Sequence, residues 1–249
     1  MKIVAIIPAR YASTRFPGKP LARLVDRPMI QHVYERVLKS PVISKAVVAT
    51  DSEDIARCVE GFGGQVLMTS PEHRCGTERI AEAAGLLRLA DQDIVVNIQG
   101  DQPLLAPPVI EELVKPLLLN GDLPMSTVAT LFRREEEVFD PNRVKVVVDR
   151  QGRAIYFSRS PIPYFRPPGT KPRYLRHIGI YAYRRWALEE FVSLAEGELE
   201  AAEKLEQLRA LENGWPLAVV ITRYECPEVD TPEDLAYVEG LLKETTPTQ

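Results

Sequence analysis

The sequence predicts an α/β fold: a Rossmann-like core with a mixed, mainly parallel sheet, helices on both faces and an inserted antiparallel lobe. Two observations predict the core. Short apolar runs alternate with amphipathic segments of helical period, and polar motifs follow directly where several apolar runs end. A third observation predicts the insert, because after Met125 strand-like segments follow one another with little helix between them. We expect one domain over residues 1–249, with a core at about 1–125 and 215–243 and the insert at about 126–214.

The elements of the expected core follow in chain order. Ile3–Ile7 is a run of five apolar residues and predicts the first strand, and residues 29–38 place their apolar side chains on one helical face. Asp51-Ser52 follows the next strand and offers an N-cap for a helix that runs through Val59. The remaining core elements are strands at 46–50, 65–68 and 94–98 and helices at about 77–90 and 108–119.

The expected insert is richer in strands. Residues 149–152 read Asp-Arg-Gln-Gly and predict a hairpin turn between two of these strands. The expected elements are strands at 127–132, 144–149, 154–157 and 177–183, helices at 186–194 and 199–211, a strand at 217–222 and a last helix at 232–242.

Composition narrows the class of protein. The formal net charge is −4, which argues against nucleic acid as the main partner. The three cysteines have no metal-binding spacing, which favours a reducing cytoplasm over a disulfide framework. No apolar run approaches the roughly 20 residues that would span a membrane, so we expect no membrane partner.

The first motif, residues 8–21, directly follows the first predicted strand. It carries three cations, Arg10, Arg15 and Lys19, on a loop rich in small residues, which suits a polyphosphate at the carboxyl end of a strand. A solvated basic loop is the alternative. The common phosphate loop is excluded, because Gly18-Lys19 is followed by Pro20-Leu21 and no hydroxyl stands there for magnesium.

Two further motifs contain carboxylates. In residues 97–103, Gly100 permits a close backbone approach, and Asp101 either lies beside phosphates as a metal ligand or is an ordinary turn residue. In residues 229–235, Thr231, Pro232 and Asp234 resemble a capped helix start. Asp230 precedes this cap and is not needed for it, which leaves it free to act as a hard metal ligand.

Seven segments together resemble the family of 3-deoxy-manno-octulosonate (Kdo) cytidylyltransferases, in order over nearly the whole chain. They are IPARYASTRFPGKPL at 7–21, GTER at 76–79, NIQGDQP at 97–103, YFSRSPIP at 156–163, RHIGIYAY at 176–183, LEQLR at 205–209 and VDTPEDL at 229–235. The resemblance implies a nucleotide-diphospho-sugar transferase fold. It also implies a cytoplasmic, homodimeric enzyme that uses CTP and magnesium to activate Kdo for lipopolysaccharide biosynthesis.

The resemblance also assigns roles to residues. It implies that Asp101 and Asp230 hold magnesium, and that they act in catalysis with Arg10 and Lys19. The implied nucleotide contacts are Pro8, Ala9, Arg10, Ser13, Arg15, Lys19, Thr77, Arg79, Gln99, Gly100 and Asp101. The implied sugar contacts are Gln99, Arg159, His177, Tyr183, Glu206 and Gln207.

Several of these residues have an ordinary structural alternative. Arg159 could be a loop charge, and His177 and Tyr183 could be core residues with satisfied polar tips. Arg79, Glu206 and Gln207 could lie on helix surfaces. The chain also departs from the family pattern at Cys75, where Ser is usual, and at Gln102, where Glu is usual and would add a negative charge beside the metal.

The sequence leaves two alternative functions. A CMP-sialic acid synthetase catalyses the same reaction on another acidic 2-keto sugar, but its first loop normally reads PARGGSKGIPxKN, which residues 8–20 do not. A non-catalytic nucleotide-binding regulatory module is the second alternative. Such a module need not retain both Asp101 and Asp230.

Overall fold

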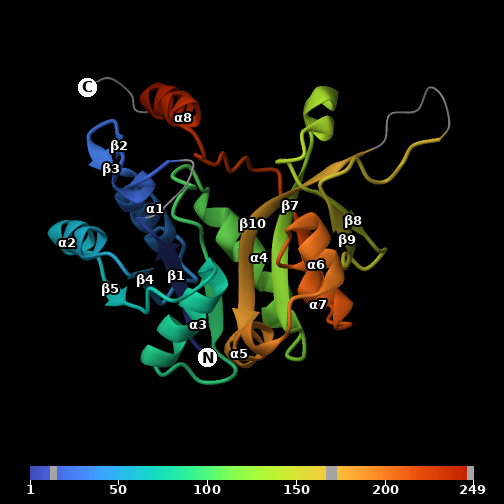
Figure 1. Ribbon diagram of the computed structural model, residues 1–249, viewed down its shortest axis with the longest axis horizontal. Helices are drawn as coiled ribbons and strands as arrows, with labels where there is room; N and C mark the ends of the chain where they lie inside the picture. The colour runs from blue at the N-terminus through green and yellow to red at the C-terminus, as the bar shows by residue number, and fades with distance from the viewer. Residues whose placement is uncertain (12–15, 167–172, 246–249) are drawn as a thin grey trace.

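A nine-stranded mixed sheet forms the centre of the protein, in a computed structural model that describes residues 1–11, 16–166 and 173–245 (Figure 1). The main path through the sheet runs β11-β7-β10-β6-β1-β4-β5. Strands β6, β1, β4 and β5 are parallel, as expected for the core, while β10 is antiparallel to both β6 and β7. The bounds are β1 Ile3–Ala9, β4 Lys45–Thr50, β5 Val66–Met68, β6 Ile94–Asn97, β7 Met125–Leu131, β10 Leu175–Arg184 and β11 Leu217–Ile221.

Helices cover both faces of this sheet, because each face carries its own apolar layer. One buried cluster joins alternate residues of β1 to α1, α2 and α4, and a second joins the intervening residues to α3, α5 and α7. The predicted α/β class and the helices on both faces are therefore confirmed. The bounds are α1 Met29–Leu38, α2 Glu53–Gly61, α3 Gly76–Leu86, α4 Pro107–Leu119, α5 Arg185–Ser193 and α7 Leu208–Glu212.

Strands β7 and β10 lie inside the central sheet, and a hairpin of β8 (Lys145–Val148) and β9 (Ala154–Ser158) extends from β10. The predicted turn is confirmed, with Gly152 at a φ of 77°. In Figure 1 this hairpin lies at the side of the sheet away from α1 and α2, next to α6 (Glu198–Glu203) and α7. A short 3-10 helix, η2 (Glu135–Phe139), precedes it.

Two predicted helices are wrong in extent. The helix expected to reach residue 90 ends at Leu86, and Arg88 adopts a φ of 52°, which leaves the right-handed helical region. The single helix expected at 199–211 is two helices, α6 (Glu198–Glu203) and α7, because Lys204 adopts a left-handed conformation with a φ of 52°. Periodicity continues across such breaks and does not detect them.

The last helix, α8 (Pro232–Thr245), packs at the upper edge of the molecule in Figure 1, above the small sheet of β2 (Arg23–Leu24) and β3 (Arg27–Pro28). Its predicted cap is confirmed, since the Asp234 amide donates to Thr231 Oγ1 at 3.2 Å and the Thr231 amide donates to Asp234 Oδ2 at 2.9 Å. Within the described ranges, no helix is long and apolar enough to cross a membrane.

Candidate active site

Three distant segments meet at one lysine. Lys19 begins η1 (Lys19–Leu21) after β1, Asp101 follows β6, and Asp230 lies just before α8. Lys19 Nζ lies 2.6 Å from Asp101 Oδ2 and 3.3 Å from Asp230 Oδ1. The Val229 amide donates to the Asp101 carbonyl at 2.9 Å and ties the last segment to the loop after β6. The structure thus brings together the two carboxylates and one of the cations named from the sequence.

The electrostatics of this cluster suit a bound cation. Burial by itself would lower the pKa of Lys19, but the neighbouring carboxylates of Asp101 and Asp230 outweigh it and raise that pKa. Two hard oxygen donors converge on a single positive charge, and magnesium is typically held by one or two carboxylates together with substrate phosphates. Among the described residues no group of three or more His, Cys, Asp or Glu side chains is placed to hold a metal ion.

The floor of the site is built by close backbone approach. A Cβ on Gly100 would lie 3.4 Å from the Pro8 carbonyl oxygen, and a Cβ on Gly76 would lie 3.4 Å from Pro8 Cγ. The end of β1, including Ala9, the loop after β6 and the start of α3 therefore meet at Pro8. Arg10 follows at once and donates from Nη1 to the Arg74 carbonyl at 3.2 Å. Its Nη2 atom is buried without a hydrogen-bond partner in the described part of the chain.

Ser13 and Arg15 lie outside the described residues. Of the remaining nucleotide contacts, Thr77 is buried in the first turn of α3, and Gln99 is partly buried with its amide 3.3 Å from Asn97 Oδ1. Arg79 is fully buried, so the alternative of a helix-surface residue is wrong. Its guanidinium donates to Thr69 Oγ1 at 2.6 Å and to Asp51 Oδ2 at 2.8 Å, which ties α3 to the carboxyl ends of β4 and β5.

Two of the side chains named for the sugar, those of Glu206 and Tyr183, lie close to the start of α3. Glu206 accepts a hydrogen bond from Thr77 and lies 3.6 Å from Cys75 Sγ. Burial raises the pKa of Glu206, and burial together with the Glu206 charge raises the pKa of Cys75 to about 11. Tyr183 of β10 is buried beside them, and burial holds its pKa well above the usual range. Glu206 is therefore not a helix-surface residue.

His177 lies nearer the start of β10 than Tyr183 and is buried. Its Nε2 atom is 2.9 Å from Thr127 Oγ1, and its ring contacts Phe157 edge to face. Burial lowers the pKa of His177 to about 3, so the ring is neutral at ordinary pH. Gln207 is 5 % exposed, which excludes the helix-surface alternative, and its Nε2 atom has no partner among the described residues.

Arg159, also named for the sugar, forms its side-chain hydrogen bonds with backbone carbonyls. Its guanidinium donates to three carbonyl oxygens, those of Glu203 at 2.6 Å, Pro141 at 2.9 Å and Lys204 at 3.3 Å. These contacts fix the end of β9 to the end of α6. The guanidinium of Arg159, named from the sequence as a sugar contact, thus also holds these elements together.

Two residues of the site were not singled out in the sequence. Glu228 accepts a hydrogen bond from the fully buried Gln102 at 3.1 Å, and burial and the nearby Asp101 charge raise its pKa to about 6. Tyr181 stacks at a tilt between His177 and Tyr183 on β10. Glu228 places a carboxylate beside Gln102, the position at which this chain lacks the Glu that is usual in the family. Its place in the sequence, two residues before Asp230, is the feature from which it could have been predicted.

Comparisons with known proteins agree with this geometry. The model of the family described as Cytidylyltransferase matches residues 4–223. The chain therefore belongs to the cytidylyltransferase family. Two relatives named 3-deoxy-manno-octulosonate cytidylyltransferase are 55% identical over 97% of both chains, from Syntrophus aciditrophicus, and 52% identical over 97% of this chain and 98% of the other, from Desulfosudis oleivorans. The family resemblance read from the sequence is thereby confirmed.

Solved structures give the same result. The structure of a CMP:2-keto-3-deoxy-manno-octonic acid synthetase complexed with CTP superposes with a TM-score of 0.92 at 42% identity, covering 99% of this chain and 100% of the other. A 4-diphosphocytidyl-2C-methyl-D-erythritol synthase from Anaerococcus prevotii, at 16% identity and a TM-score of 0.62 over 97% and 96% of the two chains, shares the fold alone.

Proposed function

We propose that this protein transfers the cytidylyl group of CTP to Kdo, forming CMP-Kdo and pyrophosphate. The observation that carries the proposal is the cluster of Lys19, Asp101 and Asp230, which three separate segments assemble at the carboxyl ends of β1 and β6. Ligands of open α/β sheets bind at this edge. The names of the close relatives supply the nucleotide and the sugar.

The chain's own residues position the triphosphate. Arg10 has a buried nitrogen that no described residue satisfies, and Lys19 has a raised pKa that keeps it cationic, so both suit the phosphates that depart as pyrophosphate. Asp101 and Asp230 would hold magnesium. When bound, magnesium supplies positive charge that stabilises the phosphoryl oxygens and acidifies the attacking hydroxyl.

The Kdo 2-hydroxyl attacks the α-phosphate in line and releases its proton to solvent as the new P–O bond forms, while the bond to pyrophosphate breaks. The neutral, buried His177 is unsuited to take up this proton at a pKa of about 3. We place the sugar hydroxyls near Glu206, Tyr183 and Gln207. The support is that Gln207 carries a buried amide without a partner among the described residues, and that Glu206 lies beside Cys75 at the start of α3.

We also infer a cytoplasmic homodimer in which segment 126–214 provides the subunit contacts. Ile155 of the β8–β9 hairpin is 60% exposed and offers an apolar contact, whereas Val146 of the same hairpin is buried. A dimer predicts a sedimentation mass of twice the 28.0 kDa chain. A mass equal to one chain at micromolar concentration would exclude the dimer.

Pyrophosphate release tests the function and separates it from its alternatives. With CTP and magnesium, we expect release with Kdo and little with N-acetylneuraminate. Release with N-acetylneuraminate alone would identify a CMP-sialic acid synthetase. CTP binding without release from either sugar would indicate a regulatory nucleotide-binding module.

A further inference from the structure

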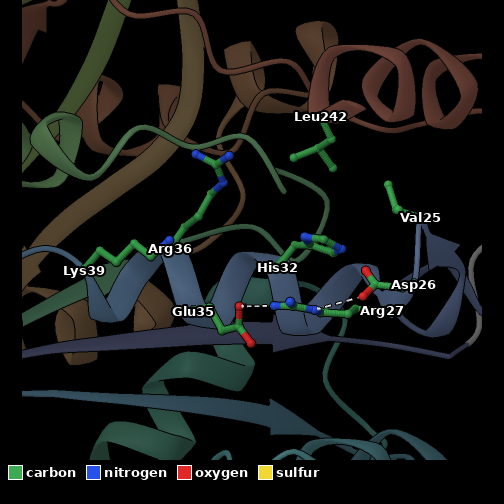
Figure 2. Close-up of a pocket in the computed structure, with 8 residues that line it drawn as sticks. All are labelled: Val25, Asp26, Arg27, His32, Glu35, Arg36, Lys39 and Leu242. Carbon is green, nitrogen blue, oxygen red and sulfur yellow. Dashed lines mark hydrogen bonds and ion pairs between the residues drawn. The ribbon is translucent and has the colours of Figure 1, made fainter. Parts of the chain in front are cut away.

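A polar cavity of about 350 Å³ lies between α1, the β2–β3 hairpin and α8. None of the residues that line it belongs to the candidate active site. Its volume falls within the range of small-molecule sites. The lining residues, shown in Figure 2, are Val25, Asp26, Arg27, His32, Glu35, Arg36, Lys39 and Leu242.

The two acids of this cavity are already paired. Arg27 Nη1 lies 2.9 Å from Glu35 Oε2, and Arg27 Nε lies 3.6 Å from Asp26 Oδ2. The other Glu35 oxygen accepts a hydrogen bond from Gln31 at 2.8 Å. One arginine of the wall therefore faces both acids and offsets one of their two negative charges.

Arg36 and Lys39 are not paired. Neither side chain has a hydrogen bond or ion pair within the described ranges, and Arg36 is half-buried. Figure 2 shows Arg36 and Glu35 leaving α1 on opposite sides, so the free guanidinium faces away from that carboxylate. Burial lowers the pKa of Arg36, and nearby Cys226 offers no counter-charge because burial raises its pKa to about 11.

The geometry points to a second ligand site, in which Arg36 and Lys39 bind the phosphoryl group of a small phosphorylated molecule. A guanidinium binds two phosphate oxygens at once. The two acids, two arginines and one lysine of the wall leave a net charge of +1, which favours an anionic group such as a phosphate monoester. His32 donates from Nε2 to the Leu24 carbonyl at 2.9 Å, which leaves Nδ1 for a hydrogen bond with a hydroxyl of the same molecule.

An occupant would also stabilise the position of α8. This helix packs on the hairpin and α1 through a small apolar cluster that includes Leu24, Met29, Val238 and Leu242. Since Leu242 also lines the cavity, a molecule held by Arg36 on α1 adds contacts at the same junction. The ligand should therefore raise the melting temperature of the protein.

Binding of inorganic phosphate without magnesium tests this site. Isothermal titration is performed in a Lys19→Ala background, which weakens phosphate binding at the active site. Here we expect saturable binding and a phosphate-dependent rise in melting temperature. Arg36→Gln and, separately, the solvent-exposed Lys39→Gln should each weaken binding by about tenfold or more. The matched control Lys115→Gln changes an exposed lysine on α4 and should leave binding unchanged.

Two outcomes would overturn the proposal. One is the absence of saturable phosphate binding in the Lys19→Ala background. The other is equal binding by the Lys39→Gln and Lys115→Gln proteins, which does not depend on whether the half-buried Arg36 can be replaced without unfolding.

Discussion

Replacing Lys19 by alanine should have opposite effects on catalysis and on magnesium binding. The ammonium contacts Asp101 at 2.6 Å and Asp230 at 3.3 Å, so the two carboxylate oxygens lie less than ~6 Å apart. Without the ammonium they repel each other by about 1–3 kcal/mol at effective dielectric constants between those of water and a protein surface. The metal-free Lys19→Ala protein should be destabilised by up to that amount, and magnesium alone should bind it more tightly than the wild type.

Turnover should fall at the same time. A charge-assisted contact to a phosphate contributes about 1.5–3 kcal/mol, so kcat/KM for CTP should drop roughly 10- to 150-fold at saturating magnesium and Kdo. Pyrophosphate release gives kcat/KM, and melting curves with EDTA or magnesium give the stability change, with Lys115→Ala as the exposed control. An unchanged kcat/KM for Lys19→Ala would refute the assigned role of Lys19 in phosphate binding.

The other predictions concern stability. In metal-free protein the raised pKa of Glu228, about 6 against an ordinary 4.5, means that the folded state binds its proton more tightly. Stability should then fall by about 2 kcal/mol as pH rises through 4.5 to 6, and Glu228→Gln should remove that fall in urea titrations; an unaltered pH slope would contradict it. His177 has the opposite sign, because its pKa is lowered from 6.5 to about 3. The stability that this lowered pKa contributes is fully present above pH 6.5 and is lost as the pH falls toward 3. The free energy of unfolding of His177→Gln should therefore depend less on pH in this range, and a pH dependence identical to that of the wild type would argue against this. The buried Arg209 lies 2.6 Å from Glu200, and Arg209→Met should cost about 3–5 kcal/mol by leaving that carboxylate unpaired. A melting temperature equal to that of the wild type would show that Glu200 finds another partner.

The core of the fold was predictable because local signals agree with the tertiary structure. The helix at 29–38 has the predicted bounds, and the Ser52 side chain accepts a hydrogen bond from the Ile55 amide, as its predicted capping role requires. The break at Lys204 was not predictable, because a left-handed residue leaves no mark in apolar periodicity. The place of β10 between β6 and β7 depends on pairing between distant strands, which a local pattern does not specify.

In the candidate active site, too, some residues were predictable from the sequence and others were not. Lys19, Asp101 and Asp230 were named from motifs, and the structure brings their charges into contact. Arg159 and Arg79 are bound to other parts of the chain, because a cation in a motif carries no information about the carbonyls and carboxylates that it meets after folding. Glu228 was missed because its place two residues before Asp230 does not reveal the hydrogen bond with Gln102, which forms only in the folded chain.

A double-mutant cycle on Asp101 and Asp230 tests the central claim most directly. Asn replaces each carboxylate with a group of similar shape and removes its charge. If both residues act as one unit, Asp101→Asn and Asp230→Asn should each lose most turnover while the protein stays folded, and the double variant should be little worse than the poorer single variant. Near-normal pyrophosphate release by Asp230→Asn at limiting magnesium, or strictly additive losses in the double variant, would contradict this account.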